Sequence, residues 1–272
     1  MSSTAIALSH PSAERAPSRI LTIYWKEAKY EFLKNLRLRV YSLSVISFPL
    51  MFYVLFGLVL NSKEAPIGGT NITSYLVATY GTFGVMGASL FGTASALASE
   101  RGLGWLQIKR ATPMPPFAYF TAKFVMSMIF SGTVVVLLML LGILFGGVHL
   151  AILDAAKLLG TLVAGSLPFA AMGLAIGYFA GPNSAPSTIN LIYLPLSFCS
   201  GLWVPIMFLP KFFRQLAHVL PSYHLSQLAL GVFHAGQREP AATHWEVLIA
   251  FTMICLGVAR LGFQREQDKL YG

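Results

Sequence analysis

Six long apolar runs, separated by shorter polar segments, constrain this sequence more than any other feature. A helix needs about 20 residues to cross the roughly 30 Å hydrocarbon layer of a membrane, and these runs are close to that length. The alternating strand pattern of an outer-membrane barrel is absent, so helices must satisfy the backbone in lipid. The predicted spans cover residues 41–60, 74–98, 124–147, 158–180, 187–204 and 245–262.

The composition agrees with a membrane domain. Hydrophobic residues make up 56% of the chain and charged residues only 11%, whereas about 25% of a soluble domain is charged. The net charge of +9 could suggest nucleic acid as a partner. However, the Lys and Arg residues lie in the gaps between apolar runs and do not form a basic stripe with interleaved aromatics. We therefore expect a lipid membrane as a partner and no nucleic acid.

The same Lys and Arg residues predict the orientation of the chain. With a cytoplasmic N-terminus, fourteen of them fall in inner segments and five in outer ones, as the positive-inside rule requires. Both termini are then cytoplasmic, with a disordered tail over residues 1–17 and a second tail over 263–272. Residues 41–262 form the six-helix transmembrane domain between them.

Residues 18–40 are predicted to form an amphipathic helix that lies in the membrane interface. Leu21, Trp25 and Phe32 recur at helical spacing, and Lys26 and Glu27 fall on the opposite side. This pattern suits a helix with one face in the headgroup region. A cytoplasmic helix that packs on another protein is the alternative.

The segment 205–244, before the last span, is too apolar for a hydrated loop, yet its amphipathic patterns are too short to cross a membrane. Pro205, Pro210 and Pro221 interrupt it. We predict short re-entrant helices that dip into the outer leaflet, and a small extracellular helical cap is the alternative.

Several kinds of site are missing from the sequence. No GxxxxGK[ST] motif occurs, so the chain is not expected to bind the phosphates of ATP itself. The histidines on the predicted outer side lack zinc-helix spacing, and the two cysteines lack CxxC spacing. We predict no metal site, no cofactor in this chain and no catalytic residues, and hence no enzyme.

Ionisable residues lie at the ends of the predicted spans and not near their midpoints, as at Glu100, Asp154, Glu246 and Arg260. Ion-coupled carriers usually place carboxylates or cations inside the membrane. This distribution argues against an ion-coupled secondary transporter, which remains the alternative from another class, as does a membrane interaction or regulatory protein.

The segment from Glu100 to Phe124, ERGLGWLQIKRATPMPPFAYFTAKF, mixes basic and apolar residues as a docking helix would. It resembles the cytoplasmic loop of ABC-2 permeases, the membrane subunits of one class of ATP-binding-cassette exporters. The matching residues are Glu100, Arg101, Gly104, Leu106, Arg110, Ala111, Thr112, Pro113, Tyr119 and Lys123. Trp105 and Lys109 depart from the family's usual residues.

The outer segment SGLWVPIMFLPKFFRQLAHVLPSYHL is similar to the stretch after the fifth span of the same family. The matching residues are Ser200, Gly201, Pro205, Leu209, Pro210, Leu220, Pro221 and Tyr223. With the span count and the interfacial helix, the resemblance extends over essentially the whole chain.

This resemblance implies a half-transporter in the bacterial plasma (inner) membrane. A second permease copy or close paralogue would complete the pathway, and a separate P-loop ATPase subunit would bind ATP and Mg²⁺. Residues 99–123 would be the coupling loop to that ATPase. The coupling residues would be Glu100, Arg101, Gly104, Leu106, Arg110 and Pro113, with Lys26 and Glu27 as secondary candidates. Gly201, Pro205, Pro210, Pro221 and Tyr223 would shape the outer re-entrant segment.

In such a half-transporter the substrate path would lie at the dimer seam, lined by the first, second and fifth spans. The expected activity is export of an amphipathic, drug-like or lipid-like substrate, because these three spans contain no charged residue. Aromatic residues make up 13% of the chain, so a polysaccharide or glycolipid that stacks on aromatic rings is the alternative cargo.

Overall fold

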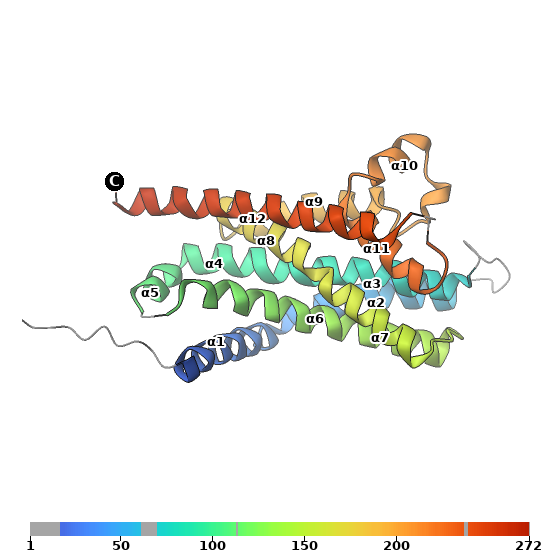
Figure 1. Ribbon diagram of the computed structural model, residues 1–272, viewed down its shortest axis with the longest axis horizontal. Helices are drawn as coiled ribbons and strands as arrows, with labels where there is room; N and C mark the ends of the chain where they lie inside the picture. Colours follow the sequence, from blue (N-terminus) through green and yellow to red (C-terminus); the bar gives the residue numbers. More distant parts are fainter. Residues whose placement is uncertain (1–16, 61–69, 113, 237–238, 272) are drawn as a thin grey trace, which may run out of the picture.

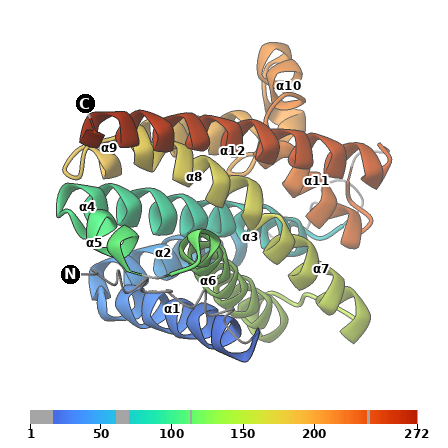
Figure 2. The same ribbon diagram turned by 60° about the vertical axis from the view of Figure 1, so that its left-hand side comes forward.

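The computed structural model describes residues 17–60, 70–112, 114–236 and 239–271. These residues form a bundle of long helices that lie side by side, with the short helix α10 standing away from the bundle (Figures 1 and 2). The predicted all-α fold is therefore confirmed for the described residues. Within the part of the chain that the structure describes, five helices are long and apolar enough to cross a membrane: Tyr41–Val59, Ile72–Gly102, Phe117–Phe145, Ile152–Phe179 and Ala241–Gln267.

Several of these long helices consist of consecutive elements. The first half of the chain contains α1 (Pro17–Arg37), α2 (Arg39–Phe52), a π-helix (Tyr53–Val59), α3 (Ile72–Leu90), a second π-helix (Phe91–Ser95), α4 (Ala96–Gly102), α5 (Trp105–Ala111) and α6 (Pro116–Phe145). The second half contains α7 (Ile152–Ala164), α8 (Ser166–Phe179), α9 (Ala185–Cys199), a 3-10 turn (Ile206–Phe208), α10 (Lys211–Ala217), α11 (Pro221–Val232) and α12 (Ala241–Tyr271).

Five of the six predicted spans coincide with the long helices, but the span predicted at 187–204 is shorter than expected. Its helix, α9, has 15 residues, or roughly 22 Å at 1.5 Å per residue, against about 30 Å of hydrocarbon. The helix ends early because Gly201 takes a left-handed conformation with φ 75°, which terminates a helix at low cost only for glycine. The count of six spans therefore stays a prediction.

Other helix boundaries also differ from the predicted ones. The third span begins at Phe117 instead of residue 124, directly after Pro116 at the first turn of α6, a position that proline favours. The last helix continues to Tyr271, so most of the predicted tail over 263–272 is helical. The helix predicted at 18–40 is α1, followed by a break at Leu38 (φ −76°, ψ 75°). Apart from Pro17, the predicted tail over 1–17 lies outside the described residues.

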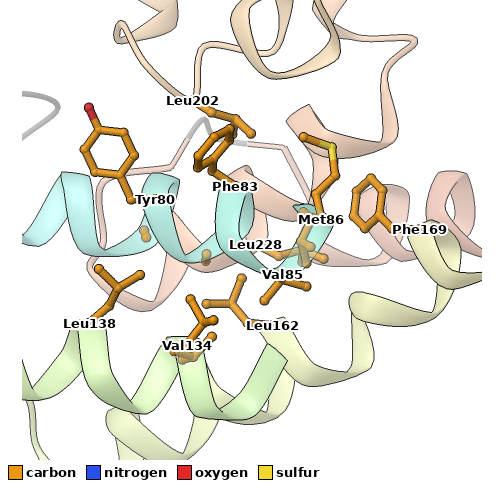
Figure 3. Packing of buried hydrophobic residues seen from close by; sticks show 14 of the residues in the cluster. Tyr80, Phe83, Val85, Met86, Val134, Leu138, Leu162, Phe169, Leu202 and Leu228 are labelled. Atoms are coloured by element: carbon orange, nitrogen blue, oxygen red, sulfur yellow. The ribbon is translucent and has the colours of Figure 1, made fainter. Parts of the chain in front are cut away.

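The core of the bundle is built around α3, whose side chains are buried almost from end to end. Figure 3 shows side chains of α6, α7, α8 and α11 packed around α3: Phe169 of α8 lies beside Met86, and Phe83 faces Leu202 on another side of α3. Small residues permit this close packing: a Cβ on Gly173 of α8 would lie 1.8 Å from the Thr93 hydroxyl, and such contacts bring membrane helices together. The second span is therefore held from several sides, which fixes the position of α4 at its end.

The outer segment contains short helices, as predicted. Pro210 precedes α10 and Pro221 opens α11, in agreement with the preference of proline for helix starts. Tyr223 packs with Ile206, Leu209 and Ala217 in a small apolar cluster. How deeply these helices enter a membrane stays a prediction.

Candidate functional site

The candidate site lies at the end of the bundle where α4 and α5 meet α1, the start of α6 and the last turns of α12, on the left in Figure 1. With the orientation predicted from the basic residues, this would be the cytoplasmic end. Charged side chains from five helices meet here, and most of them are buried or half-buried.

Lys123 of α6 is the centre of the site. Its side chain is fully buried, and its ammonium donates hydrogen bonds to Glu31 Oε1 of α1 at 2.5 Å and to Glu100 Oε1 of α4 at 3.0 Å. The Tyr119 hydroxyl donates to Glu100 Oε2 at 2.6 Å, and Lys34 forms an ion pair with the same carboxylate. Two ammonium groups thus face two carboxylates, as buried charges require.

Asn35 and Ser42 hold Glu31 in place. The Asn35 amide donates to Glu31 Oε1 at 3.1 Å and to the Glu31 carbonyl oxygen at 2.9 Å. The Ser42 hydroxyl of α2 donates to the Asn35 carbonyl oxygen at 2.6 Å. The junction between α1 and the first span is therefore bonded to the carboxylate that binds Lys123.

α5 is attached to this cluster by one apolar and one charged residue. Leu106 is buried with Leu97 and Tyr119. Lys109 donates to Glu27 Oε1 of α1 at 2.5 Å and lies 4.9 Å from the centre of the Tyr119 ring, within range of a cation–π contact.

The pKa of Lys109 lies above its ordinary value. Burial alone would lower the pKa of this ammonium, but the hydrogen bond to Glu27 and the nearby charges of Glu100, Glu27 and Glu31 raise it. Lys109 is therefore charged throughout the physiological range.

The opposite side of α5 is open. Leu103, Trp105 and Ile108 are 72%, 53% and 57% exposed. Because the orientation prediction puts this segment outside the hydrocarbon, these apolar side chains form a surface suited to a protein partner. We call these three residues the α5 surface.

Arg101 connects the other side of α4 to α8 and α12. Its Nε donates to Glu266 Oε2 of α12 at 2.5 Å, and its Nη1 donates to the Gly177 carbonyl oxygen of α8 at 2.7 Å. The guanidinium also lies 5.8 Å from the centre of the Tyr178 ring. Glu100 and Arg101 are adjacent, but they bond to different halves of the bundle.

Glycine makes the turn between α4 and α5. Gly104 has φ 74° and no heavy atom within 4 Å of a hypothetical Cβ. Glycine is thus favoured here by the left-handed backbone conformation and not by a lack of space for a side chain. Gly102 is restricted by space, since a Cβ there would lie 2.1 Å from Pro182 Cγ.

The structure brings together Glu100, Arg101, Gly104, Leu106 and Glu27 from the predicted coupling set. Lys26 does not join them: its side chain is exposed. Arg110 lies on α5, where only its backbone is described, and Pro113 lies outside the described residues. The predicted outer residues Gly201, Pro205, Pro210, Pro221 and Tyr223 lie at the other end of the bundle.

Sequence reasoning missed Glu31, Lys34, Asn35 and Glu266. Glu27, Glu31 and Lys34 follow one another at spacings of four and three residues, so they share a helix face. This spacing could have indicated that Glu31 and Lys34 belong to the same charged site as Glu27. For Glu266 the sequence offers no comparable signal, because its partner Arg101 is 165 positions away.

Comparisons with known proteins show the family of this chain. A family model described as "ABC-2 type transporter" matches residues 24–234, more than three quarters of the chain. A protein of Bacillus subtilis (strain 168) named "Putative transport permease YvfS" is 25% identical over 248 residues, which is 91% of this chain and 99% of that protein. The segment that the family model matches begins in α1 and includes α4, α5 and Lys123, so it contains most of the charged site. The chain is therefore a membrane permease of the ABC-2 type transporter family.

Proposed function

We propose that this chain is the transmembrane permease subunit of an ATP-binding-cassette exporter that moves an amphipathic, drug-like or lipid-like substrate outward. ATP and Mg²⁺ would bind to a separate P-loop ATPase subunit, because this sequence has no phosphate-binding loop. The second partner would be another permease copy or close paralogue. The proposed location is the bacterial plasma membrane, with both termini in the cytoplasm, in keeping with the distribution of Lys and Arg.

The observation that carries this proposal is the ionic attachment of α5 to the rest of the bundle. In the proposed mechanism the ATPase binds the α5 surface, and closure of the ATPase dimer displaces α5. Lys109 transmits the displacement to α1 through Glu27, Glu100 transmits it to α6 through Lys123, and Arg101 transmits it to α12. A partner can shift the equilibrium between two states only if its contacts differ between them, and these ion pairs provide contacts that can differ.

Aromatic side chains in and beside the first span keep a polysaccharide or glycolipid open as the alternative cargo. Phe52 stacks on Phe56 and on Trp203, with ring centroids 5.9 Å and 5.3 Å apart, and Phe56 is 42% exposed. Sugar rings stack on such exposed aromatic faces. Transport assays with labelled drugs, lipids and glycans separate the two cargo classes.

The test is charge reversal in the reconstituted complex. Glu100→Lys and Arg110→Glu are expected to leave ATP hydrolysis measurable while substrate flux per ATP falls about tenfold or more, the effect of losing one to two kcal/mol of coupling. Asp154→Lys is the matched control, because Asp154 pairs with its neighbour Lys157 at an exposed site on α7, away from α4 and α5.

Wild-type flux per ATP in the charge-reversed complexes would contradict the coupling role. Flux that needs no ATPase and follows an ion gradient would instead favour the secondary-transporter alternative. Absence of both flux and ATPase stimulation in the wild-type complex would favour a regulatory membrane protein.

A further inference from the structure

A buried pair of histidines lies at the end of the bundle opposite the charged site. His224 of α11 and His244 of α12 are each 3% exposed, and their Nδ1 atoms are 2.8 Å apart. The Nε2 atom of His224 lies 2.8 Å from the His218 carbonyl oxygen. The pair therefore connects α11 and the end of α10 to the start of α12.

The hydrogen-bond partners assign the protons in this pair. A carbonyl oxygen can only accept, so His224 Nε2 must carry a hydrogen and donate it. In neutral His224 the Nδ1 atom then has a lone pair, and the hydrogen between the two rings belongs to His244 Nδ1. His244 Nε2 keeps the remaining lone pair of the two rings.

This assignment determines what added protons would do. The first proton binds His244 Nε2, and His244 Nδ1 still donates to His224. The Glu239 carboxylate, with Oε2 3.8 Å from His244 Nδ1, compensates the new charge. The second proton can bind only His224 Nδ1, which then points a hydrogen at the N–H of His244. The bond between the rings is lost, and two cations face each other with ring centroids 5.1 Å apart.

The surrounding elements supply few charges to offset a second proton. Nearby groups are His218 at the end of α10, 3.6 Å from Glu239 Oε1, Tyr223 on α11, and Tyr75 of α3, which interacts electrostatically with Tyr223. The charged residues at the start of α7, which also packs on α11, pair with each other. Glu239 is therefore the one carboxylate among these described neighbours, and it is shared between two histidines.

We propose that the His224–His244 pair is a proton-binding site that holds α11 against the start of α12 with up to one added proton and releases it when a second proton binds. The outer segment would then loosen in an acidic medium on that side of the membrane. Four side chains converge here, but the described residues contain no His, Cys, Asp and Glu group suited to a metal ion, so the ligand proposed is the proton. This inference does not depend on the ATPase partner or on transport.

The test is hydrogen exchange of the full chain in phosphatidylcholine nanodiscs at about pH 7.5 and about pH 5, with correction for the intrinsic exchange rate. Protection of amides in 224–232 and 241–248 is expected to fall about fivefold or more at the lower pH, because local opening sets exchange. The double variant His224→Gln, His244→Asn keeps a donor towards each acceptor but cannot titrate, so its protection should not change with pH. His149→Gln, at an exposed histidine near the same end, should respond like the wild type.

Nitrogen-15 NMR of histidine-labelled wild-type chain provides a test that needs no variant. At neutral pH it should show His224 protonated at Nε2 and His244 protonated at Nδ1. The proposal is overturned if the tautomers differ, if wild-type protection is the same at both pH values, if the double variant loses protection as the wild type does, or if a chelator abolishes the response.

Discussion

At the scale of single residues, Lys123 places a buried charge within the long apolar helix Phe117–Phe145. Its ammonium is fully buried and has two carboxylate partners and an aromatic ring 5.1 Å away. Burying an ion is costly unless its partners are complete. The stability of the site therefore depends on the whole set of charges and not on one pair.

We expect Lys123→Met to destabilise the chain by about 3–5 kcal/mol, because it leaves Glu31 and Glu100 buried with fewer counter-charges. Lys157→Met, which removes an exposed pair with Asp154, should cost less than about 1 kcal/mol. Unfolding in detergent measures both. Adding Glu31→Gln to Lys123→Met should recover part of the loss, and equal effects at Lys123 and Lys157 would contradict the proposed burial cost.

Gly104→Ala is expected to cost about 1–2 kcal/mol, because alanine must adopt the left-handed conformation in a place where space is free. Gly104→Asn should cost less, since asparagine tolerates this conformation. The thermal unfolding temperature of Gly104→Asn should therefore be higher than that of Gly104→Ala. If Gly104→Ala were the more stable variant, a packing contact at this position, and not the backbone conformation, would explain the glycine.

At the scale of elements, α5 is an amphipathic helix with a buried ionic and apolar side and an exposed apolar side. The sequence pattern predicted a docking helix here, but it did not predict which of the helix residues are buried and which are exposed. Seven residues make fewer than two full turns, so periodicity is weak. Packing on α4 and α6 decides the side that Leu106 takes.

Ile108→Asp is expected to reduce copurification of the ATPase about tenfold or more while leaving the thermal stability of the permease unchanged, because Ile108 is exposed on the α5 surface. Phe208→Asp is the control, with a comparably exposed apolar residue at the other end of the bundle. Loss of copurification in both variants, or in neither, would rule out the α5 surface as the docking site.

The Lys109–Glu27 pair predicts a pH dependence. A raised pKa in the folded state means that the stabilisation is complete below the unfolded-state pKa of about 10.4 and is lost as pH rises through the higher folded value. The stability difference between wild type and Lys109→Met should therefore be constant from about pH 7 to 9 and shrink above about pH 10.5. Unfolding curves across this range measure it, and a difference that changes between pH 7 and 9 would contradict the assignment.

At the scale of the whole molecule, Glu100 and Arg101 link both halves of the bundle at one end of α4. Glu100 contacts α1 and α6, and Arg101 contacts α8 and α12. The last turns of α12 therefore belong to the charged site, although the matched family segment ends at residue 234.

Glu266→Arg should lower substrate flux per ATP several-fold, and the exchange Arg101→Glu with Glu266→Arg should restore part of it, since the ion pair forms again with reversed charges. Restoration is incomplete because Arg101 also donates to Gly177. Glu246→Arg, an exposed position at the other end of α12, is the control. An exchange variant no better than Glu266→Arg alone would show that the pair does not act as a unit.

The apolar runs alone predicted the helical membrane class and five of the spans, because a span depends on hydrophobic length within one continuous segment. Glu100, Arg101, Gly104 and Leu106 were predicted as one group through the resemblance of their segment to ABC-2 permeases. The tertiary structure was needed to show that Glu31 and Glu266 join this group, that Lys123 is its buried centre and that α9 is short. Partners separated by 92 and 165 positions, as in Lys123–Glu31 and Arg101–Glu266, leave no periodic signal. Their pairing follows from how α1, α6 and α12 pack around α4, and burial then compels the charges to meet.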